Sequence, residues 1–490
     1  MDLNVKKFRI YFDLLVYHII SQKKESKGKK LGTELILINI YKAILVTSTT
    51  YILWYNLEWW NYLWIENERC NVKKTIRDFD FNDKTALVRV DFNVPLKDGK
   101  VTGDDRIIKA IPTIEYLVDN GAKVVLMSHL GRPKGEYKKE LSLEAVAKRA
   151  SELLKKDVKF IASKEVVDEK VKEEVKNLKK GEIALLENLR FVKGEEKNDP
   201  DFAKELASLG DIFVNDAFGT AHRAHASNVG VTEFLPSSAG LLVEKEIKYF
   251  EDALKNPEKP FAAILGGSKV SDKIGVIENL LEKVDTLVIV GAMANTFLKS
   301  KGLEVGKSLV EDDKLDLARE MMAKAVENHV ELILPEDVIV APEVSEDAKG
   351  TLKDVEEVDQ EDMILDIGKE SLEDIKASLE MANTVVLNGP CGVFEIEEFS
   401  HGTIELAKIL ANLDATVIVG GGDSVAAVEK AGVADKLTHI STGGGASLEM
   451  LEGKRLPGIE AVEEAWEKNI FVEIGRWIRL LLRPLNLQKK

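Results

Sequence analysis

The stretch Phe261–Leu281 (FAAILGGSKVSDKIGVIENLL) combines residue types that can bind a phosphate group. It begins with the short apolar run Phe261–Leu265, whose length and composition predict a strand that is buried on both faces of a parallel sheet. Gly266 and Gly267 then predict a tight turn whose backbone amides can approach an anion closely. A helix expected to begin near Ser271 would point its amide end at the same place.

Two lysines of this stretch could supply positive charge to the same site. Lys269 and Lys273 are four residues apart, so both ammonium groups would lie on one side if helical geometry held through the turn. Amides and ammonium groups together favour phosphate as the ligand. The alternative is that both lysines are solvated surface residues of an ordinary strand, turn and helix, and this stretch alone does not decide between the two.

Basic side chains follow the predicted strands in the first half of the chain. They lie in SHLGRPKG, LLENLRF and NDAFGTAHRAH, and in the segment that follows DFNVP. Arginine suits planar, two-pronged contact with carboxylate or phosphate and stays charged at any working pH. A small ligand with both groups would need several arginines, although any one of them could instead pair with an acid on a solvated surface. The set comprises Arg106, Arg132, Arg190 and Arg223, with His129, His222 and His225 beside them.

Glycine turns gather in the second half. TVIVGGGDS predicts a strand, the turn Gly420–Gly422 and a helix whose first turn holds Asp423. The amides could hold phosphates while Asp423 holds Mg²⁺, an ion that proteins usually bind through one or two carboxylates and the substrate phosphates. NGPCGVFE offers Asn388 and also Glu395, which could accept hydrogen bonds from ribose hydroxyls, and STGGGAS adds the amide-rich turn Gly443–Gly445.

Two common nucleotide-binding motifs do not occur in the sequence. GLEVGKS, at Gly302–Ser308, places its glycines one residue too close together for a Walker A motif. A GxGxxG fingerprint with a downstream ribose-binding acid is also missing, which weakens the hypothesis of a dinucleotide site.

The elements that must position these residues alternate between short strands and longer helical patterns such as Ser142–Leu154. Such alternation predicts parallel sheets, which bind ligands beyond the carboxyl ends of their strands. Gly240–Leu254 has helical spacing, so we interpret it as a helix that connects two domains. The predicted strands are Thr85–Val90, Lys123–Met127, Val158–Ile161, Ile183–Leu186 and Ile212–Asn215 in the first domain, and Phe261–Leu265, Thr286–Val290, Glu331–Leu334, Thr384–Leu387, Thr416–Val419 and Thr438–Ile440 in the second.

Composition sets limits on the class of protein. A chain of 490 residues, 45% hydrophobic and 31% charged, is sufficient for two or three globular domains. The net charge of −16 argues against a nucleic-acid partner and requires that a site for an acidic small molecule be locally basic. Cys70 and Cys391 form no CxxC motif, which fits a reducing cytoplasm rather than a disulfide framework.

The two ends differ in composition from the middle of the chain. All six tryptophans lie near the ends, and residues 1–72 and 465–490 are therefore interpreted as extensions. Leu35–Tyr55 is mostly apolar and leads into an aromatic cluster, as in a membrane-spanning helix with an interfacial belt. Lys42 and the polar patch Thr47–Thr50 lower its hydropathy, so we favour an extension without native structure over a membrane anchor. A secretory signal peptide is not indicated.

Eight motifs together resemble the phosphoglycerate kinase family. The resemblance covers roughly Lys73–Ala461 and is specific because so many long motifs occur in the family's order. It implies an α/β enzyme with two Rossmann-like parallel-sheet domains joined by a hinge helix, here with additional N- and C-terminal extensions. The motifs are RVDFNVP, SHLGRPKG, LLENLRF, NDAFGTAHRAHAS, LGGSKVSDKIGV, NGPCGVFE, VGGGDS and STGGGASLE.

The resemblance also implies a reaction and a set of site residues. A phosphoryl group would move reversibly between 1,3-bisphosphoglycerate and MgADP, giving 3-phosphoglycerate and MgATP, with Mg²⁺ held by Asp423. Arg106, Lys269 and Lys273 would be catalytic. The implied substrate-binding residues are Asp91, Asn93, Arg106, His129, Arg132, Arg190 and Arg223. The implied nucleotide-binding residues are Gly266, Gly267, Lys273, Asn388, Glu395, Gly421, Gly422, Asp423 and Ser424, and the implied transition-state amides are those of Gly443, Gly444 and Gly445.

The same resemblance divides the chain and suggests how it works. Residues 73–239 would bind 3-phosphoglycerate, 240–254 would form the hinge helix and 255–464 would bind the nucleotide. The acceptor carboxylate is already ionised at neutral pH, so the transfer requires no general base and rests on positioning and charge neutralisation. Closure about the hinge would expel water from the site. We expect a cytoplasmic monomer.

Two departures from the family pattern lie near the site, and two other functions stay open. Ser268 stands where the family often has alanine, and Cys391 where methionine or valine is usual; neither change removes a role named above. The hydrophobic extension motivates a membrane-tethered or scaffolding protein without turnover. The doubled sheet pattern alone would also fit another nucleotide-dependent enzyme, such as a dehydrogenase.

Overall fold

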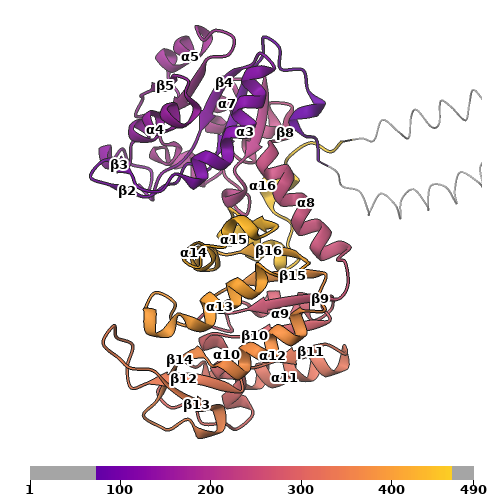
Figure 1. Ribbon diagram of the computed structural model, residues 1–490. Helices are drawn as coiled ribbons and strands as arrows, with labels where there is room; N and C mark the ends of the chain where they lie inside the picture. The colour runs from indigo at the N-terminus through magenta and orange to yellow at the C-terminus, as the bar shows by residue number, and fades with distance from the viewer. Residues whose placement is uncertain (1–72, 466–490) are drawn as a thin grey trace, which may run out of the picture. The chain divides into compact units, whose positions relative to one another are not determined.

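The computed structural model describes residues 73–465, which contain two six-stranded parallel sheets (Figure 1). The first sheet has the strand order β5-β6-β4-β1-β7-β8. Its central strand pairs Thr85 with Lys123 on one side and Ala86 with Ile212 on the other. The strands are β1 (Thr85–Val90), β4 (Lys123–Met127), β5 (Val158–Ile161), β6 (Ile183–Leu186), β7 (Ile212–Asp216) and β8 (Ser237–Ala239).

Helices cover both faces of the first sheet. Neighbouring residues of β1 point to opposite sides, so Val88 packs with α3 and α4 while Leu87 packs with α5 and α7. This double burial explains why the strands are continuously apolar rather than alternating. The helices are α3 (Asp105–Asp119), α4 (Glu144–Leu154), α5 (Glu169–Lys176), α6 (Lys193–Glu196) and α7 (Pro200–Ala207).

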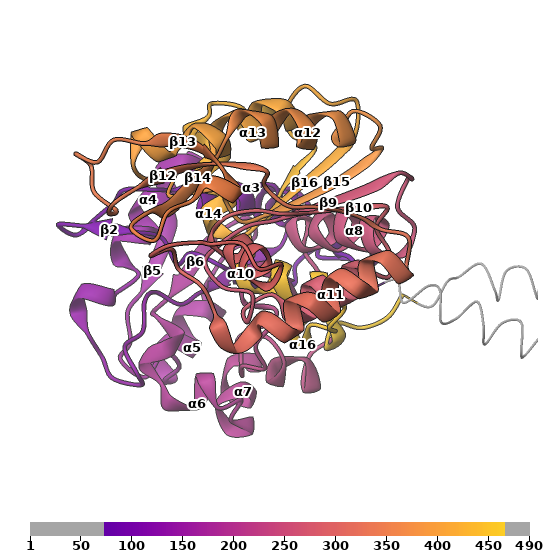
Figure 2. The ribbon, with the colours of Figure 1, turned by 90° about the horizontal axis from the view of Figure 1, so that it is seen from below.

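The second sheet is built in the same way, in the order β11-β10-β9-β15-β16-β17. Ala263 and Leu265 of β9 face α9, α10 and α15, whereas Ala262 and Ile264 face α12 and α13. Figure 2 shows α12 and α13 on one side of these strands and α10 and α11 on the other. The strands are β9 (Phe261–Leu265), β10 (Thr286–Ile289), β11 (Glu331–Ile333), β15 (Thr384–Asn388), β16 (Thr416–Gly420) and β17 (His439–Ile440).

Four helices of the second domain, α10, α12, α14 and α15, begin at glycines that follow strands. A separate antiparallel sheet, in the order β13-β12-β14, is formed by the segment between β11 and β15. Its strands are β12 (Asp337–Ala341), β13 (Thr351–Asp354) and β14 (Met363–Ile367), and a further short pair is β2 (Leu96–Lys97) with β3 (Lys100–Val101). The helices are α9 (Ile274–Leu280), α10 (Ala292–Ser300), α11 (Leu315–Glu327), α12 (Lys369–Leu379), α13 (His401–Leu410), α14 (Gly422–Lys430), α15 (Gly444–Leu451) and α16 (Pro457–Glu460).

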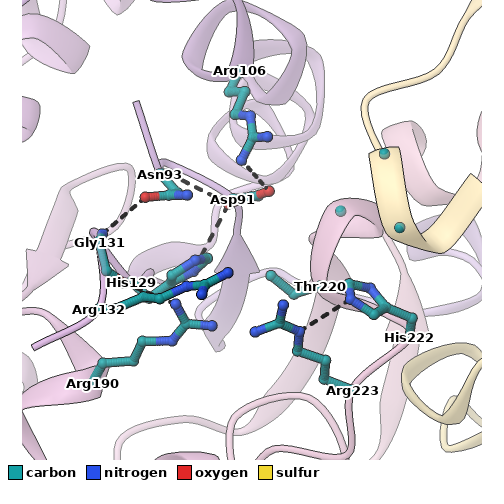
Figure 3. A pocket seen from close by; sticks show the side chains of 13 residues that line it. Asp91, Asn93, Arg106, His129, Gly131, Arg132, Arg190, Thr220, His222 and Arg223 are labelled. Carbon is teal, nitrogen blue, oxygen red and sulfur yellow. Dashed lines mark hydrogen bonds and ion pairs between the residues drawn. The ribbon is translucent and has the colours of Figure 1, made fainter. Parts of the chain in front are cut away.

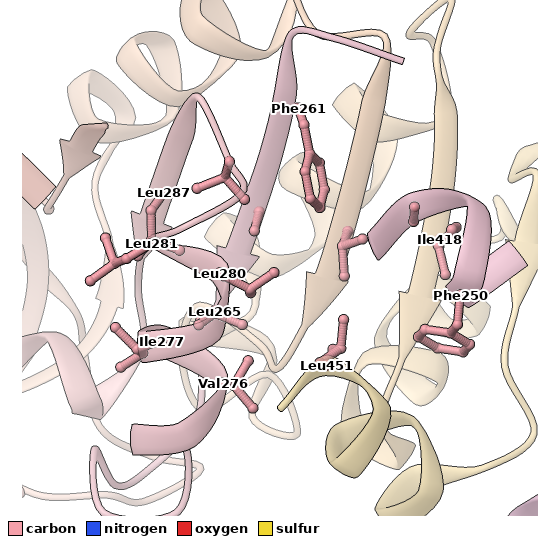
Figure 4. Packing of buried hydrophobic residues seen from close by; sticks show 14 of the residues in the cluster. Phe250, Phe261, Leu265, Val276, Ile277, Leu280, Leu281, Leu287, Ile418 and Leu451 are labelled. Atoms are coloured by element: carbon pink, nitrogen blue, oxygen red, sulfur yellow. The ribbon is translucent and has the colours of Figure 1, made fainter. Parts of the chain in front are cut away.

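A single helix, α8 (Leu241–Lys255), joins the last strand of the first sheet to the first strand of the second. Its buried Phe250 stacks on Phe218 of the first domain with ring centroids 6.0 Å apart. Phe250 also belongs to the same apolar cluster as Phe261 and Leu451 of the second domain (Figure 4). The connecting helix is therefore anchored in both cores.

The C-terminal segment of the described region returns to the first domain. The amide of Lys74 donates to the carbonyl of Glu463 at 2.8 Å, and Lys73 and Glu464 form an isolated antiparallel bridge. The side chain of Asn215, at the end of β7, donates to the carbonyl of Gly458 at 2.8 Å. These contacts fasten the C-terminal segment of the described region to the first sheet.

The predicted fold class is confirmed: the chain forms two parallel-sheet domains with a helix between them. The expected helix Gly240–Leu254 corresponds to α8, and the expected Ser142–Leu154 to α4, which begins at Glu144. The sequence analysis missed β8 and the antiparallel sheet β13-β12-β14. The predicted domain boundaries stay predictions.

The two extensions lie outside the described residues. The predictions for 1–72, including the apolar segment Leu35–Tyr55, and for the tail after Ala465 therefore stay predictions. Within residues 73–465, none of the helices combines the length and the apolar character needed to cross a membrane.

Candidate active site

Loops from the carboxyl ends of β1, β4 and β7 enclose a cavity of about 320 Å³ together with the glycine turn that opens α15 (Figure 3). The cavity brings together all seven predicted substrate residues and two of the three predicted amide residues. Its lining is Asp91, Asn93, Arg106, His129, Gly131, Arg132, Arg190, Gly219, Thr220, His222, Arg223, Gly444 and Gly445. The lining residues between 91 and 223 converge because parallel strands end at one edge of a sheet, and Gly444 and Gly445 reach them from the second domain.

Asp91 organises one wall of the cavity. Its Oδ2 accepts a hydrogen bond from the Arg106 guanidinium at 2.7 Å, and Arg106 projects from the first turn of α3. Asn93, two residues further along the same turn, accepts from the amide of Gly131 at 2.9 Å. The DFNVP turn therefore holds both the arginine and the SHLGRPKG loop in place.

The opposite wall is strongly basic. Arg190 is only 5% exposed and donates to the carbonyl of Gly131 at 2.8 Å, so its charge is fixed in position. Burial lowers the pKa of Arg190, and the nearby Arg223 lowers it further although Glu196 opposes both effects. Arg132 is exposed at the rim. An anionic ligand would relieve the repulsion among these guanidinium groups.

His222 and Arg223 meet the second domain directly. The Nε of Arg223 donates to the Nε2 of His222 at 3.0 Å, and that ring lies against the start of α15. A Cβ on Gly443 would come within 2.5 Å of the Phe218 ring, and a Cβ on Gly445 within 3.2 Å of the His222 Nε2. The glycines thus allow the amide end of α15 to reach the arginine-lined cavity.

A second cluster of glycine turns lies at the carboxyl ends of β9, β10 and β15. These strands are neighbours in the sheet, and their turns pack backbone against backbone. A Cβ on Gly266 would lie 2.1 Å from the carbonyl oxygen of Pro390, and one on Gly389 would lie 2.2 Å from that of Gly266. Gly267 also has a φ of +117°, so glycine is required there for conformation.

Lys273 does not lie where the sequence analysis expected. The turn Ser271–Lys273 precedes α9, which begins at Ile274, three residues after the expected start near Ser271. Lys273 is buried and its ammonium donates to the carbonyls of Gly266 at 2.6 Å and Asn388 at 2.5 Å, and to the Asn388 Oδ1 at 2.6 Å. Burial lowers the pKa of Lys273 to about 8, although the nearby carboxylates of Asp423 and Asp272 raise it. The side chain of Lys269 is exposed instead.

Tertiary contacts explain this difference. Val270, between the two lysines, is fully buried in the core of the second domain. The amide and hydroxyl of Ser271 both donate to the carboxylate of Glu311, at 2.9 and 2.6 Å. These two anchors hold the segment as an irregular loop, and they also identify Glu311 as a residue that the sequence analysis did not select.

The turn before α14 agrees with the sequence analysis. Gly421 has a φ of +95°, and Asp423 is exposed in the first turn of the helix. The Oγ of Ser424 accepts from the amide of Gly389 at 2.6 Å, which ties this turn to the NGPCGVFE loop. The Nδ2 of Asn388 is buried without a hydrogen-bond partner among the described residues and lies beside Gly420 and Gly421. A buried donor of this kind lowers the stability of the fold unless a ligand or a water molecule accepts its hydrogen bond.

The NGPCGVFE loop is held by hydrogen bonds to Thr403 and Leu365 and packs against Asp366, three residues that the sequence did not reveal. Thr403 accepts from the amide of Cys391 at 3.0 Å, and the carbonyl of Leu365 accepts from that of Val393 at 2.8 Å. Asp366 lies beneath Gly392 and accepts from the amide of Gly402 at 2.7 Å, while its other oxygen has no partner among residues 73–465. Glu395 lies further along the loop and is exposed.

We expect Asp366→Asn to change how stability depends on pH. Burial raises the pKa of the Asp366 carboxyl from its ordinary 3.8 to about 7, against the hydrogen bonds of the Gly402 and Ile367 amides. The stability that the neutral acid contributes is therefore complete below about pH 4 and lost as the pH rises through 7. Asparagine cannot ionise, so the unfolding free energy of the variant relative to wild type should rise across this window, by up to ~1.4 kcal/mol per pH unit.

Urea unfolding at several pH values measures this difference. Asp414→Asn is the matched control, because Asp414 is exposed in the same domain. The difference in unfolding free energy between this variant and wild type should be the same at every pH. A flat difference for Asp366→Asn as well would mean that Asp366 is charged throughout the pH range and that the predicted dependence is wrong.

Loops of two parallel-sheet domains, one rich in arginine and the other in glycine amides, define a two-domain phosphotransferase. The family model described as phosphoglycerate kinase matches residues 76–454. The phosphoglycerate kinase of Finegoldia magna is 57% identical over 392 residues, which cover 80% of this chain and 99% of that protein. The chain belongs to the phosphoglycerate kinase family.

Solved structures agree with this membership. The phosphoglycerate kinase of Coxiella burnetii superposes with a TM-score of 0.73 at 45% identity and covers 80% of this chain and 98% of its own. The phosphoglycerate kinase of Pyrococcus horikoshii superposes with a TM-score of 0.70 at 37% identity, and the match covers 79% of this chain and 98% of that one. The protein is an enzyme that transfers a phosphoryl group reversibly between 1,3-bisphosphoglycerate and MgADP, with Mg²⁺ as cofactor. Family membership therefore argues against a dehydrogenase or a scaffold without turnover.

Proposed function

We propose that the arginine-lined cavity of the first domain binds 3-phosphoglycerate and its acyl phosphate. The observation that carries this proposal is the convergence of Arg106, Arg132, Arg190 and Arg223 on one cavity of a protein whose net charge is −16. A ligand with a carboxylate at one end and a phosphate at the other offers each guanidinium a planar or tetrahedral anion. Asp91, Asn93 and His129 complete the proposed site and orient the ligand.

The nucleotide would lie across the glycine turns of the second domain. The backbone amides of Gly267, Gly421 and Gly422 suit the phosphates. Gly266, whose own amide donates to the carbonyl of Asn388 at 3.0 Å, would shape the turn. The unpartnered Asn388 Nδ2 supports the same position, since it needs an acceptor. Ser424 would act from the first turn of α14, Glu395 would accept from the ribose hydroxyls, and Lys273 would reach the phosphates if they displaced its carbonyl partners.

Asp423 is the proposed protein ligand of Mg²⁺. Its carboxylate is exposed in the first turn of α14, beside the amide-lined turn. Among residues 73–465, no group of three or more acidic, histidine or cysteine side chains could hold a metal ion alone. A single carboxylate fits Mg²⁺, because this ion keeps several waters and takes its other ligands from substrate phosphates. When bound, the ion would neutralise charge on those phosphates.

Transfer would take place between the two domains. Arg106 from the first domain and Lys269 from the second would neutralise the charge that spreads over the phosphoryl oxygens, and the amides of Gly443, Gly444 and Gly445 would do the same from the start of α15. The acceptor carboxylate needs no general base. We further propose that residues 73–239 and 255–464 act as substrate and nucleotide domains, that the enzyme is a monomer without nucleic-acid or membrane partners, and that it works in the cytoplasm.

Two single variants test whether the first domain binds 3-phosphoglycerate and the second binds the nucleotide. Arg223→Lys should raise the KM for 3-phosphoglycerate about tenfold while leaving that for MgATP near its wild-type value, because lysine cannot make the two-pronged contact. Asp423→Asn should raise the KM for MgATP about tenfold or more and leave that for 3-phosphoglycerate unchanged. A coupled assay in the ATP-consuming direction measures both constants.

The control is Arg319→Lys, because Arg319 is a partly exposed arginine of α11 that pairs with Asp316 away from both proposed sites. It should leave both constants unchanged. If each of the two site variants raised both KM values equally, the assignment of acid and nucleotide to separate domains would have to be given up.

A further inference from the structure

A fully buried arginine lies beneath the floor of the arginine-lined cavity. Arg89 is on β1, two residues before Asp91, and has an exposed fraction of 0%. An isolated buried guanidinium would be strongly destabilising, so its partners must compensate its charge. The carboxylates that balance it are those of Glu195 of α6, which is also 0% exposed, and Asp91, with Glu195 contributing the larger effect.

These two groups are connected by one hydroxyl. The Ser227 hydroxyl donates to the Oε1 of Glu195 at 2.6 Å and accepts from the Nε of Arg89 at 2.9 Å. The amide of Ser227 donates to the other carboxylate oxygen at 3.1 Å. At its far end, Arg89 contacts the Nδ1 of His129 through NH2 at 3.2 Å and donates through NH1 to the carbonyl of Val90. A continuous chain therefore runs from Glu195 through Ser227 and Arg89 to His129.

The chemistry of arginine decides the protonation state of His129. A guanidinium group has donors and no acceptor, so a hydrogen bond between it and Nδ1 requires that Nδ1 carry a lone pair. The Asp91 Oδ1, the nearest carboxylate oxygen, is 3.8 Å from Nδ1 and too far to accept a hydrogen bond from it. The proton of the neutral ring then lies on Nε2, the nitrogen that remains for the cavity that His129 lines.

The charges around His129 favour the same state. Burial lowers the pKa of His129 well below its ordinary value, and Arg89, Arg190, Arg106 and His225 lower it further. Among residues 73–465, Asp91 alone brings a carboxylate oxygen within 4 Å of the His129 ring, at 3.8 Å. Burial also opposes ionisation of Glu195, but His225, Arg89 and Ser227 together hold its pKa below the usual range. The chain thus ends in a charged carboxylate and a neutral imidazole.

We propose that Glu195 is a positioning residue that, through Ser227 and Arg89, holds His129 as the neutral tautomer with its proton on Nε2. His129 then donates a hydrogen bond into the cavity and selects an acceptor oxygen, such as a carboxylate or hydroxyl oxygen of the substrate. The inference rests on the proposed function, in which this cavity binds 3-phosphoglycerate. It adds residues from α6 and from the loop after β7 that do not line the cavity.

Nitrogen NMR of the full chain labelled with ¹⁵N-histidine tests the tautomer directly. The chain has seven histidines, so the spectrum of His129→Asn identifies the His129 signals. In the protein without substrate, we expect an unprotonated Nδ1 and a protonated Nε2, each with its characteristic shift, throughout the neutral pH range. A protonated Nδ1 in the wild-type spectrum would overturn the inference.

Ser227→Ala removes the link and leaves both charged groups in place. The variant should show signals of both His129 tautomers and a KM for 3-phosphoglycerate that is raised about threefold to tenfold, the effect of one hydrogen bond lost or weakened. The KM for MgATP should not change. Glu195→Gln should give the same pattern, with a lower unfolding midpoint because Arg89 loses its balancing charge. A Ser227→Ala spectrum identical to wild type would show that the chain does not set the tautomer.

Ser238→Ala is the matched control. Ser238 is a fully buried serine of the same domain whose hydroxyl has no hydrogen-bond partner among the described residues. Its substitution should alter neither the His129 signals nor the KM values. A titration with 3-phosphoglycerate distinguishes failure of the proposed substrate site from failure of the proposed hydrogen-bond chain. His129 signals that do not respond to the ligand contradict the substrate site. The tautomer of His129 in the free protein tests only the hydrogen-bond chain from Glu195 to His129.

Discussion

Lys269→Ala is expected to lower kcat about 10³-fold or more, because a single positive group aimed at the migrating phosphoryl can contribute that much to phosphoryl transfer. The KM values for both substrates should change far less, since the charge that Lys269 neutralises spreads over the phosphoryl oxygens mainly in the transition state. Steady-state assays in both directions of the reaction measure the effect.

The structure indicates that this loss would not come from unfolding. Lys269 is exposed, and the loop around it is anchored by Val270 in the core and by Ser271 on Glu311. The unfolding free energy should therefore stay within about 0.5 kcal/mol of wild type. Lys301→Ala is the control, since Lys301 is an exposed lysine of the same domain and its loss should leave kcat unaltered.

Lys273→Ala gives a contrasting result. Its ammonium holds the carbonyls of Gly266 and Asn388, so its removal should lower stability as well as activity. If Lys269→Ala kept wild-type kcat while Lys273→Ala lost it, the catalytic charge would have to be reassigned from the exposed lysine to the buried one.

The sheets could be predicted from the sequence because their signals are local. Most strands of the two parallel sheets are short, largely buried apolar runs, and the turn residues that follow them carry the site. Asp91 and Asn93 were therefore expected at the end of one strand without knowledge of the fold, and the cavity contains both of them.

What the sequence could not reveal depends on contacts between distant segments. The spacing of Lys269 and Lys273 suggested one helical face, but Glu311 holds Ser271 from 40 residues away and Lys273 turns toward Asn388, 115 residues away. No local pattern encodes such partners. Glu195 and Ser227 were missed for the same reason, since the Arg89 that they support does not line the cavity.

The antiparallel strand β13 was missed for a different reason. β13 is largely exposed and has no apolar run. β12 (DVIVA) and β14 (MILDI) carry apolar residues and are mostly buried, so composition alone does not explain why these two strands were missed. The short strand β8 consists of Ser237, Ser238 and Ala239, which carry little strand propensity. For β8 and β13, pairing with neighbouring strands, rather than composition, determines the structure.

Glu246→Ala should lower the unfolding free energy by about 3 to 5 kcal/mol, because several donors in a buried site would lose their acceptor at about 1 to 3 kcal/mol each. Glu246 lies on α8 with 0% exposed, and its carboxylate accepts from His439 Nε2 at 2.7 Å. It also accepts from the amide and hydroxyl of Thr442, at 2.6 and 2.8 Å. Alanine would leave all three donors unpaired in a buried site, and urea unfolding measures the loss.

Activity should fall together with stability, because Thr442 immediately precedes the Gly443–Gly445 turn. Glu246 connects the helix between the domains to the turn whose amides reach the arginine-lined cavity. We therefore expect it to couple the hinge position to the site. Small-angle scattering should show that wild type contracts when 3-phosphoglycerate and MgATP are both bound and that Glu246→Ala contracts less. Glu246→Gln keeps the side-chain shape and an acceptor for Thr442, and should recover most of the stability and contraction. Equal contraction in wild type and Glu246→Ala would exclude this residue from the hinge, and no contraction in wild type would contradict a hinge at α8.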